Sequence, residues 1–394
     1  MVALTALGLT CAPTTLPVYS LGVLVAPFQA EFGWGRGEIQ TAILFSTGLS
    51  IFCAPLSGSL VRRFGLRKTI LPGLAGMAIA CGIAAANTGE LWQLYAAYAL
   101  MSVLGTGAGA VGWSTLISGR FDRARGLALG LALSGTGLCA AVMPQIANFG
   151  IALLGWRGAY IMMAAFIIAI VLPICALLLP DVAIPQDDQR HHLKEHAGMD
   201  ARSALHHWRF WVLGLSTAAI YLVVGGLLPN IVPTLQDIGM TAATAASIMG
   251  LFGISVVVGR ICVGALLDIF WAPVVAIAVL VPAAFGCLLL QGEVSMVVAA
   301  TAIVLIGAAT GMELDVLGFL AARYFGIADY ARIYGRLYVF VAASAGVAPM
   351  AFGYIYDWTG SYALPLQVSA GLLLVGGAGL LTLGRYPERF AATE

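Results

Sequence analysis

The chain has 394 residues, of which 61% are hydrophobic and only 9% are charged. Soluble domains contain roughly 45 to 50% apolar and about 25% charged residues, so this composition excludes a soluble globular fold. The net charge is +1 and the sequence has no basic stripe, which argues against a nucleic-acid partner.

Apolar segments long enough to cross a bilayer recur along the whole chain. A membrane-spanning helix needs about 20 apolar residues, and lipid-exposed backbone must form its own hydrogen bonds, which favours helices over open sheets. The sequence therefore predicts an all-α membrane protein with twelve transmembrane helices. They are expected at residues 4–30, 38–60, 69–87, 91–118, 126–152, 158–180, 209–235, 242–267, 272–291, 295–322, 333–356 and 362–384.

One long polar stretch, residues 181–207, divides these spans six and six and contains all five histidines. We predict an N-terminal six-helix half over 1–180, a linker over 181–207 and a C-terminal six-helix half over 208–394. Shifting the chain by 206 residues aligns Gly33 with Gly239 and Gly58 with Gly264, which indicates diverged copies. Duplicated halves with a binding site at their midplane interface are typical of secondary transporters.

The basic residues predict the orientation. Sixteen of the 19 Lys and Arg residues follow spans 2, 4, 6, 10 and 12, two (Arg36 and Arg157) lie on the opposite side, and Arg260 lies within a span. The positive-inside rule then places both termini and the linker in the cytoplasm. We expect a multi-pass protein of the plasma (inner) membrane.

Several loop motifs carry a family resemblance. The loop after span 2 reads Gly58-Ser-Leu-Val-Arg62-Arg63-Phe-Gly65-Leu-Arg67-Lys68, and Gly264-Ala-Leu-Leu-Asp268 after span 8 is its echo. Three further signals are Glu31-Phe-Gly-Trp34-Gly-Arg36, Arg120-Phe-Asp-Arg-Ala-Arg125-Gly-Leu-Ala-Leu-Gly130, and Arg323-Tyr-Phe-Gly326 with Tyr334-Gly335. Together these motifs resemble the major facilitator superfamily, in the branch with monocarboxylate transporters and oxalate:formate exchangers.

This resemblance implies the two-half fold of that superfamily and a gating role for the loops. The gating residues it implies are Gly58, Arg62, Gly65, Arg67 and Asp268. Arg62 is a departure, because the family motif usually has an acid there, so the first loop lacks one expected ion pair.

Arg260 is the first candidate for substrate binding. A charged side chain within a span costs about 2.5 to 3.5 kcal/mol, so such a residue faces a cavity or a partner. Arg260 lies eight residues before Asp268, or about 12 Å along a helix, which is deep for a flanking residue. The resemblance implies that the Gly259-Arg260 pair meets a substrate carboxylate, which a guanidinium can bind through two hydrogen bonds. The alternatives are a snorkelling or a gate-pairing arginine.

Glu313 and Asp315 are the other charges deep in the predicted bundle. Positions i and i+2 of a helix point about 200° apart, so one of the two at most faces the central cavity. We expect one to pair with Arg260 and to couple transport to protons, and we favour Glu313 because Asp315 lies nearer the basic loop and could pair there. The alternative is that an acid caps backbone or braces neighbouring helices.

Aromatic residues complete the candidate site: Tyr19, Trp113, Tyr221, Phe319 and Tyr338. The alternative for each is a packing role, and it is favoured for Trp113, Tyr221 and Phe319. Against the family, Tyr19 stands where the animal monocarboxylate branch has a lysine, and Val256 where it has an acid. Val341 stands where the oxalate branch has a second lysine. One fixed cation favours a monoanion over a small dianion.

The sequence indicates no cofactor, metal centre or enzyme. It has no GxxxxGK[ST] loop for ATP, no catalytic Ser/His/Asp set and no metal-ligand spacing. The seven cysteines lie in apolar runs, and we interpret them as small buried packing residues.

The sequence thus predicts a secondary active transporter that moves a small organic monocarboxylate by alternating access with proton symport. Its partners would be the carboxylate, protons and the lipid bilayer, and we expect a functional monomer. Alternatives within transport are an organic anion exchanger or a carrier of bulkier aromatic acids or other organic solutes. An alternative of another class is a non-transporting membrane sensor, although the linker and tail leave no output domain.

Overall fold

The computed structural model describes residues 1–118, 130–180, 198–292, 294–326 and 329–387. Most of the motif 120–130, most of the linker 181–207 and the last residues of the tail lie outside this part of the chain. Predictions made for Arg120, Arg123, Arg125, Arg190, Lys194 and Arg389 therefore fall outside the described residues.

The described residues form helices, and Gly198 and Gly326 make an isolated β-bridge. The first part of the chain contains α1 (Val2–Leu9), α2 (Leu16–Phe32), α3 (Arg36–Phe64), α4 (Leu66–Ala85), α5 (Leu91–Leu104), η1 (Gly105–Ala108), α6 (Ala110–Ser118), α8 (Gly135–Phe166), η2 (Ile167–Val171) and α9 (Leu172–Leu178). The second part contains α10 (Ala201–His206), α11 (Trp208–Asp237), α12 (Ala242–Leu267), α13 (Ala272–Leu289), α14 (Met296–Thr310), α15 (Glu313–Phe325), α16 (Tyr330–Thr359) and α17 (Ala363–Thr382).

Within the described ranges, nine helical segments are long and apolar enough to cross a membrane, or ten when the bent α3 counts as one span. With α3 counted as one span, the remaining difference from the predicted twelve has two reasons. The first predicted span is divided into α1 and the shorter α2, and the fifth and sixth predicted spans belong to one helical segment, Gly130–Leu178.

That long segment folds back on itself within α8. Leu154 and Gly155 have non-helical backbone angles, with φ of +65° at Gly155. A Cβ atom on Gly158 would lie 2.1 Å from the carbonyl oxygen of Gly150, although eight residues of one straight helix would separate them by about 12 Å. The chain therefore reverses direction at the boundary that the sequence predicts between residues 152 and 158.

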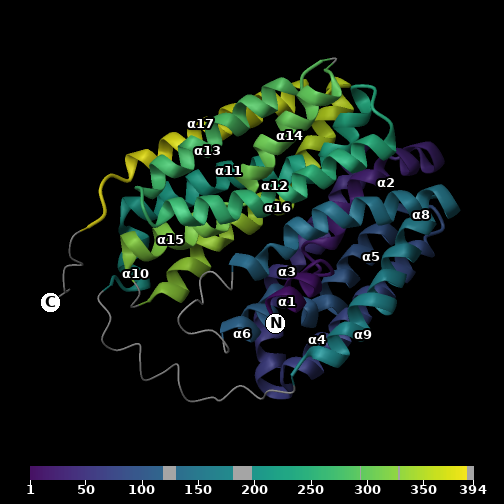
Figure 1. The fold of residues 1–394 in the computed structure, drawn as a ribbon, viewed down its shortest axis with the longest axis horizontal. Helices are drawn as coiled ribbons and strands as arrows, with labels where there is room; N and C mark the ends of the chain where they lie inside the picture. The colour runs from purple at the N-terminus through teal and green to yellow at the C-terminus, as the bar shows by residue number, and fades with distance from the viewer. Residues whose placement is uncertain (119–129, 181–197, 293, 327–328, 388–394) are drawn as a thin grey trace.

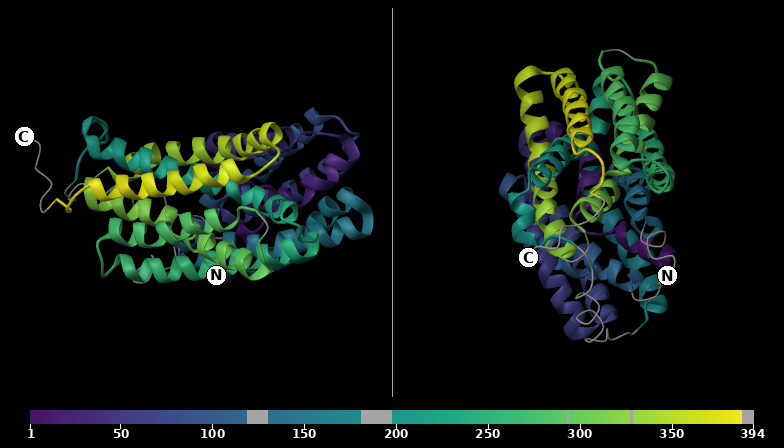
Figure 2. Two further views of the ribbon diagram at one scale, coloured as in Figure 1. Left: turned by 90° about the horizontal axis from the view of Figure 1, so that it is seen from above. Right: turned by 90° about the vertical axis from the view of Figure 1, so that its left-hand side faces the viewer.

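Two groups of helices lie side by side (Figure 1). Helices α1 to α9, in purple to blue, form one group, and α10 to α17, in teal to yellow, form the other. The views in Figure 2 show most helices running along one common direction. The groups meet where α3 packs on α16, α8 on α12 and α2 on α11.

Glycines allow the helices of the two groups to approach closely. A Cβ on Gly22 would lie 2.6 Å from the Pro229 carbonyl oxygen, and one on Gly137 would lie 2.6 Å from that of Gly253. Such contacts between small residues are the usual way in which membrane helices pack.

All seven cysteines are free. Five are buried as expected, but Cys53 is half-buried and Cys262 is exposed, so the prediction of burial is wrong for these two. Cys262 lies on the outward face of α12 beside the exposed Ile261, where an apolar thiol suits a face turned to lipid.

Candidate functional site

A break between two helices lies at the centre of the candidate site. Helix α14 ends at Thr310 and α15 begins at Glu313. A Cβ on Gly259 would lie 2.5 Å from the carbonyl oxygen of Ala308, and one on Gly311 would lie 2.3 Å from that of Val256. These glycines therefore let the backbone of α12 contact the broken segment directly, next to Arg260.

Arg260 occupies this break and is only 7% exposed. Its Nε donates to the carbonyl oxygen of Gly311 at 3.0 Å and lies 3.2 Å from Oδ2 of Asp315. Its Nη1 is buried without a hydrogen-bond partner among the described residues. A guanidinium has five N–H donors, and a buried donor left unpaired costs about 1 to 3 kcal/mol, or more when charged.

The two acids of α15 have different surroundings. Asp315 is 27% exposed and pairs with Arg260, so the suggested pairing of Asp315 with the basic loop is wrong. Glu313 is buried, and its Oε1 has no partner within the described part of the chain. It faces a cavity of about 10 Å³ between α11, α15 and α17. This cavity is lined by Leu213, Thr217, Ile220, Met312, Glu313, Val316, Leu317 and Leu380.

Two of the predicted aromatic residues approach this centre from different helix groups. Tyr19 on α2 is buried, and its hydroxyl lies within electrostatic range of Arg260 and Glu313. Tyr221 on α11 is within range of the same two charges. The structure thus brings Arg260, Glu313, Tyr19 and Tyr221 into one neighbourhood, with Asp315 bound to the arginine.

Tyr338 belongs to a row of tyrosines on α16. Tyr330, Tyr334 and Tyr338 recur every four residues, and their rings stack with centroid separations of 5.6 and 6.4 Å. Tyr338 is 42% exposed, and Asp315 lies within electrostatic range of Tyr334. The row therefore runs beside α15 from the C-terminal part of that helix towards the break.

The other two predicted aromatic residues make packing contacts. Trp113 is fully buried, donates to the carbonyl oxygen of Ala108 at 3.0 Å and lies so close to α1 that a Cβ on Gly8 would clash with its indole. The ring of Phe319 lies 6.4 Å from that of Tyr386, and the guanidinium of Arg323 covers it at 5.3 Å.

The predicted gating loop between α3 and α4 is attached to its own helix group. Gly65 has φ of +85°, a conformation that favours glycine. Arg67 donates to the carbonyl oxygen of Ala176 at 2.7 Å, and Arg62 donates to Ser59 Oγ at 3.2 Å. Gly58 lies one turn before Arg62, and Asp268 is exposed at the end of α12.

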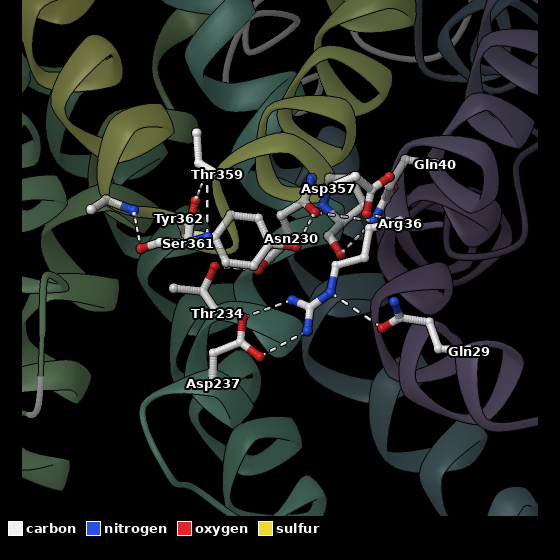
Figure 3. A network of polar contacts seen from close by, with 12 residues as sticks. Gln29, Arg36, Gln40, Asn230, Thr234, Asp237, Asp357, Thr359, Ser361 and Tyr362 are labelled. Carbon is white, nitrogen blue, oxygen red and sulfur yellow. Dashed lines mark hydrogen bonds and ion pairs between the residues drawn. The ribbon is translucent and has the colours of Figure 1, made fainter. Parts of the chain in front are cut away.

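Figure 3 shows a second polar cluster, around Arg36, Asp237 and Asp357. It lies at the end of the molecule where Arg36 and Arg157 contact the last turn of α2. We call this end the outer side. Arg36 binds Asp237 through two hydrogen bonds of 2.8 Å, and its Nε donates to Gln29 at 3.2 Å. The sequence analysis did not identify this cluster. The only available signal was that Arg36 is one of two basic residues on this side, within a motif.

Comparisons with known proteins agree with this architecture. Residues 2–325 match the family model described as Major Facilitator Superfamily. Monocarboxylate transporter 13 of Bos taurus is 27% identical over 378 residues, which cover 93% of this chain and 85% of the relative. Monocarboxylate transporter 11 of Homo sapiens is 26% identical, covering 91% of this chain and 77% of the relative.

A third relative, monocarboxylate transporter 9 of Gallus gallus, is 21% identical over 95% of this chain and 90% of its own length. These relatives are transporters, not enzymes. The chain has apolar helices that can cross a membrane several times, and it is a multi-pass membrane transporter related to the monocarboxylate transporters. It belongs to the major facilitator superfamily.

Proposed function

We propose that the protein is a secondary active transporter of a small organic monocarboxylate. The observation that carries this proposal is the buried cation at the helix break, Arg260, whose Nη1 has no hydrogen-bond partner in the described part of the chain. A carboxylate is an anion whose geometry matches the two parallel N–H groups of a guanidinium. The names of the relatives support a monocarboxylate.

In the proposed binding step, the substrate carboxylate replaces Asp315 as the partner of Arg260. Asp315 is partly exposed and held through Nε, so it can turn towards water when the substrate arrives. Arg260 itself stays buried and paired, which avoids the cost of an uncompensated buried charge. Tyr19, Tyr221 and Tyr338 are proposed to contact the rest of the substrate.

Proton coupling is assigned to Glu313 or Asp315. Symport needs a group that changes its protonation as the carrier changes state, and these carboxyls lie beside the proposed anion site. Asp315 loses its cation when the substrate binds in this scheme. Glu313 is buried next to a small cavity with one oxygen unpaired, so a proton on that carboxylate would remove the cost of a buried charge without a cation to balance it.

Transport is proposed to proceed by alternating access between two six-helix halves, 1–180 and 208–394, joined by the linker 181–207. The two helix groups in Figure 1 support this division. The basic residues predict cytoplasmic termini in a plasma (inner) membrane. We propose that one chain forms the whole pathway, because both helix groups that alternating access needs belong to the same chain.

Two other transport modes have support in particular residues. Organic anion exchange would use Arg260 in the same way but would need no titrating acid. The stacked tyrosines at positions 330, 334 and 338 favour bulkier aromatic acids as alternative substrates, because aromatic rings stack well on one another.

Counterflow into proteoliposomes tests the proposal. Vesicles containing the purified full chain are loaded with one unlabelled acid, and uptake of its labelled form is measured for aliphatic monocarboxylates, aromatic monocarboxylates and dicarboxylates. We expect exchange of at least one class of monocarboxylate and much slower exchange of dicarboxylates, because a second carboxylate would be buried unpaired. Vesicles with Arg260→Ala are the control. A folded protein that exchanges none of these acids would contradict the proposal and favour a sensor.

A further inference from the structure

The outer side of the molecule is closed by polar contacts between the two helix groups. Arg36 at the start of α3 binds Asp237, the last residue of α11, through both guanidinium Nη atoms at 2.8 Å. The Arg36 side chain is only 11% exposed, and its guanidinium lies 3.7 Å from the centre of the Tyr356 ring. An ion pair with two parallel hydrogen bonds in a partly buried environment is stronger than an exposed pair with one hydrogen bond.

Asp357 on α16 makes a second connection to the same helix start. Its two carboxylate oxygens accept hydrogen bonds from the backbone N–H groups of Arg36 at 2.9 Å and Gly37 at 2.7 Å. The first N–H groups of a helix have no partner within the helix and carry partial positive charge. The carboxylate of Asp357, in the C-terminal helix group, thus caps the N-terminus of α3 in the other group.

Backbone contact accompanies these charges. A Cβ on Gly353 of α16 would lie 2.6 Å from the backbone nitrogen of Gly37. One turn further along α3, the Gln40 amide donates to the carbonyl oxygen of Pro229 and to Oδ1 of Asn230, both at 3.3 Å. Tyr362 donates to the same Asn230 oxygen at 2.8 Å. We call Arg36, Gln40, Asn230, Asp237 and Asp357 the outer clasp (Figure 3).

The clasp contains every side-chain hydrogen bond that joins a residue before 181 to one after 197 in the described ranges. At the cytoplasmic end, by contrast, the described polar contacts stay within one helix group. Arg67 binds α9, and Asp329 accepts from the backbone of Ala201. Within the described ranges, the polar side-chain contacts between the two helix groups therefore lie on the outer side.

We propose that Arg36, Asp237 and Asp357 form the outer gate of the transporter, which is formed in this state and broken once in every cycle. This inference rests on the proposed alternating-access mechanism. It gives Arg36 a role in conformational control that is separate from the anion site at Arg260. The contacts are strong individually but few, and all of them involve the start of α3, so one movement of that helix relative to α11 and α16 separates them together.

Distance measurements between spin labels test the gate without any substrate. The labels are placed at the exposed outer positions Glu90 and Met296, one on each helix group, in a background that lacks the seven native cysteines. An open outer side should give a longer distance between the two labels. We expect each of three variants, Arg36→Gln, Asp237→Asn and Asp357→Asn, to raise the ratio of the longer-distance to the shorter-distance population by about tenfold, a typical size for such coupling. The rate of uptake of isotope-labelled acid should fall in the same variants, because the transporter must close its outer side before it can release substrate into the cytoplasm.

The chain offers a matched control on the same side. Arg157 and Glu31 form an ion pair of 3.1 Å within the N-terminal helix group. Arg157→Gln removes an outer arginine and its ion pair with Glu31 but no contact between the groups. The distance distribution should therefore remain that of the unsubstituted chain. An increase in the longer distances as large as that of Arg36→Gln would overturn the gate, because loss of charge alone would then explain the effect.

A second variant keeps the proposal testable if the charge variants fold poorly. Gly353→Ala leaves every charge in place but separates α16 from Gly37, so it should also favour the longer distance. Gly371→Ala on α17, where a Cβ would meet nothing within 4 Å, should have no effect. Unchanged distances in Gly353→Ala and in the charge variants would overturn the gate. If the distances shift as expected but no acid is exchanged in counterflow, the gate stands and the proposed substrate is wrong.

Discussion

The Nε atom of Arg260 lies 3.2 Å from a carboxylate oxygen of Asp315, beside the break between α14 and α15. The pair is unequal, because the arginine is 7% exposed and the aspartate 27%. The aspartate can move into water at low cost, whereas the guanidinium cannot leave without exposing the surrounding core. In the proposed binding step, the carboxylate of Asp315 is therefore the member of the pair that gives way to the substrate.

Arg260→Lys should keep the charge and lose the planar fork. Hydrogen bonds to charged groups contribute about 1.5 to 3 kcal/mol each, so we expect the apparent affinity for the acid to weaken by roughly 10- to 100-fold. The measurement is counterflow at increasing acid concentrations. Arg157→Lys, in an exposed pair, should behave as the unsubstituted chain. Equal affinities in Arg260→Lys, Arg260→Ala and the unsubstituted chain would remove the anchoring role.

Glu313→Gln and Asp315→Asn should separate exchange from symport. An amide cannot carry the proton, so the variant of the coupling residue should lose accumulation driven by an inward proton gradient. Exchange of acid for acid does not need the empty carrier to return and should persist.

The measurement is uptake with external and internal pH varied independently. Proton coupling is wrong if the unsubstituted protein ignores the gradient, or if both variants retain full gradient-driven accumulation. The anion-exchange alternative would then take precedence. Loss in only one variant would identify the residue that carries the proton.

Gly259→Ala should destabilise the helix contact that positions Arg260. Its Cβ would lie 2.5 Å from the Ala308 carbonyl oxygen, and forcing extra volume into a packed core costs about 1 to 3 kcal/mol. We expect a lower melting temperature and weaker acid binding together. Gly264→Ala on the same helix, where a Cβ would meet nothing within 4 Å, should melt as the unsubstituted chain does. Equal melting of both variants would contradict the tight contact.

Trp113→Phe distinguishes packing from substrate binding at that position. The indole packs against Gly8 of α1 and donates to the carbonyl oxygen of Ala108, so we expect a lower melting temperature with an unchanged apparent affinity for the acid. Thermal unfolding and counterflow on the same preparation provide the two values. A weakened affinity with normal stability would instead support the substrate contact that the sequence analysis assigned to Trp113.

The order of apolar runs, the family and the burial of Arg260 within a helix could be predicted because they depend on local properties. Whether a segment prefers lipid depends on its own side chains, and a buried arginine is conspicuous against a chain with 9% charged residues. The reversal near residue 155 could be placed for the same reason, since Gly155 lies between two apolar runs.

Which residues pair with Arg260 and with Arg36 depends on packing between segments that lie far apart in the sequence. The sequence shows that Glu313 and Asp315 face different ways, because their spacing fixes about 200° between them. It does not show which one faces Arg260, since that depends on how α15 is rotated and tilted after the break at Gly311. The outer clasp is even harder to predict from the sequence. Arg36 and Asp357 lie 321 positions apart and come into contact only when α3 packs against α16. Local composition thus determined the membrane helices and the buried cation, and tertiary packing alone decided which carboxylate holds that cation and which residues close the outer side.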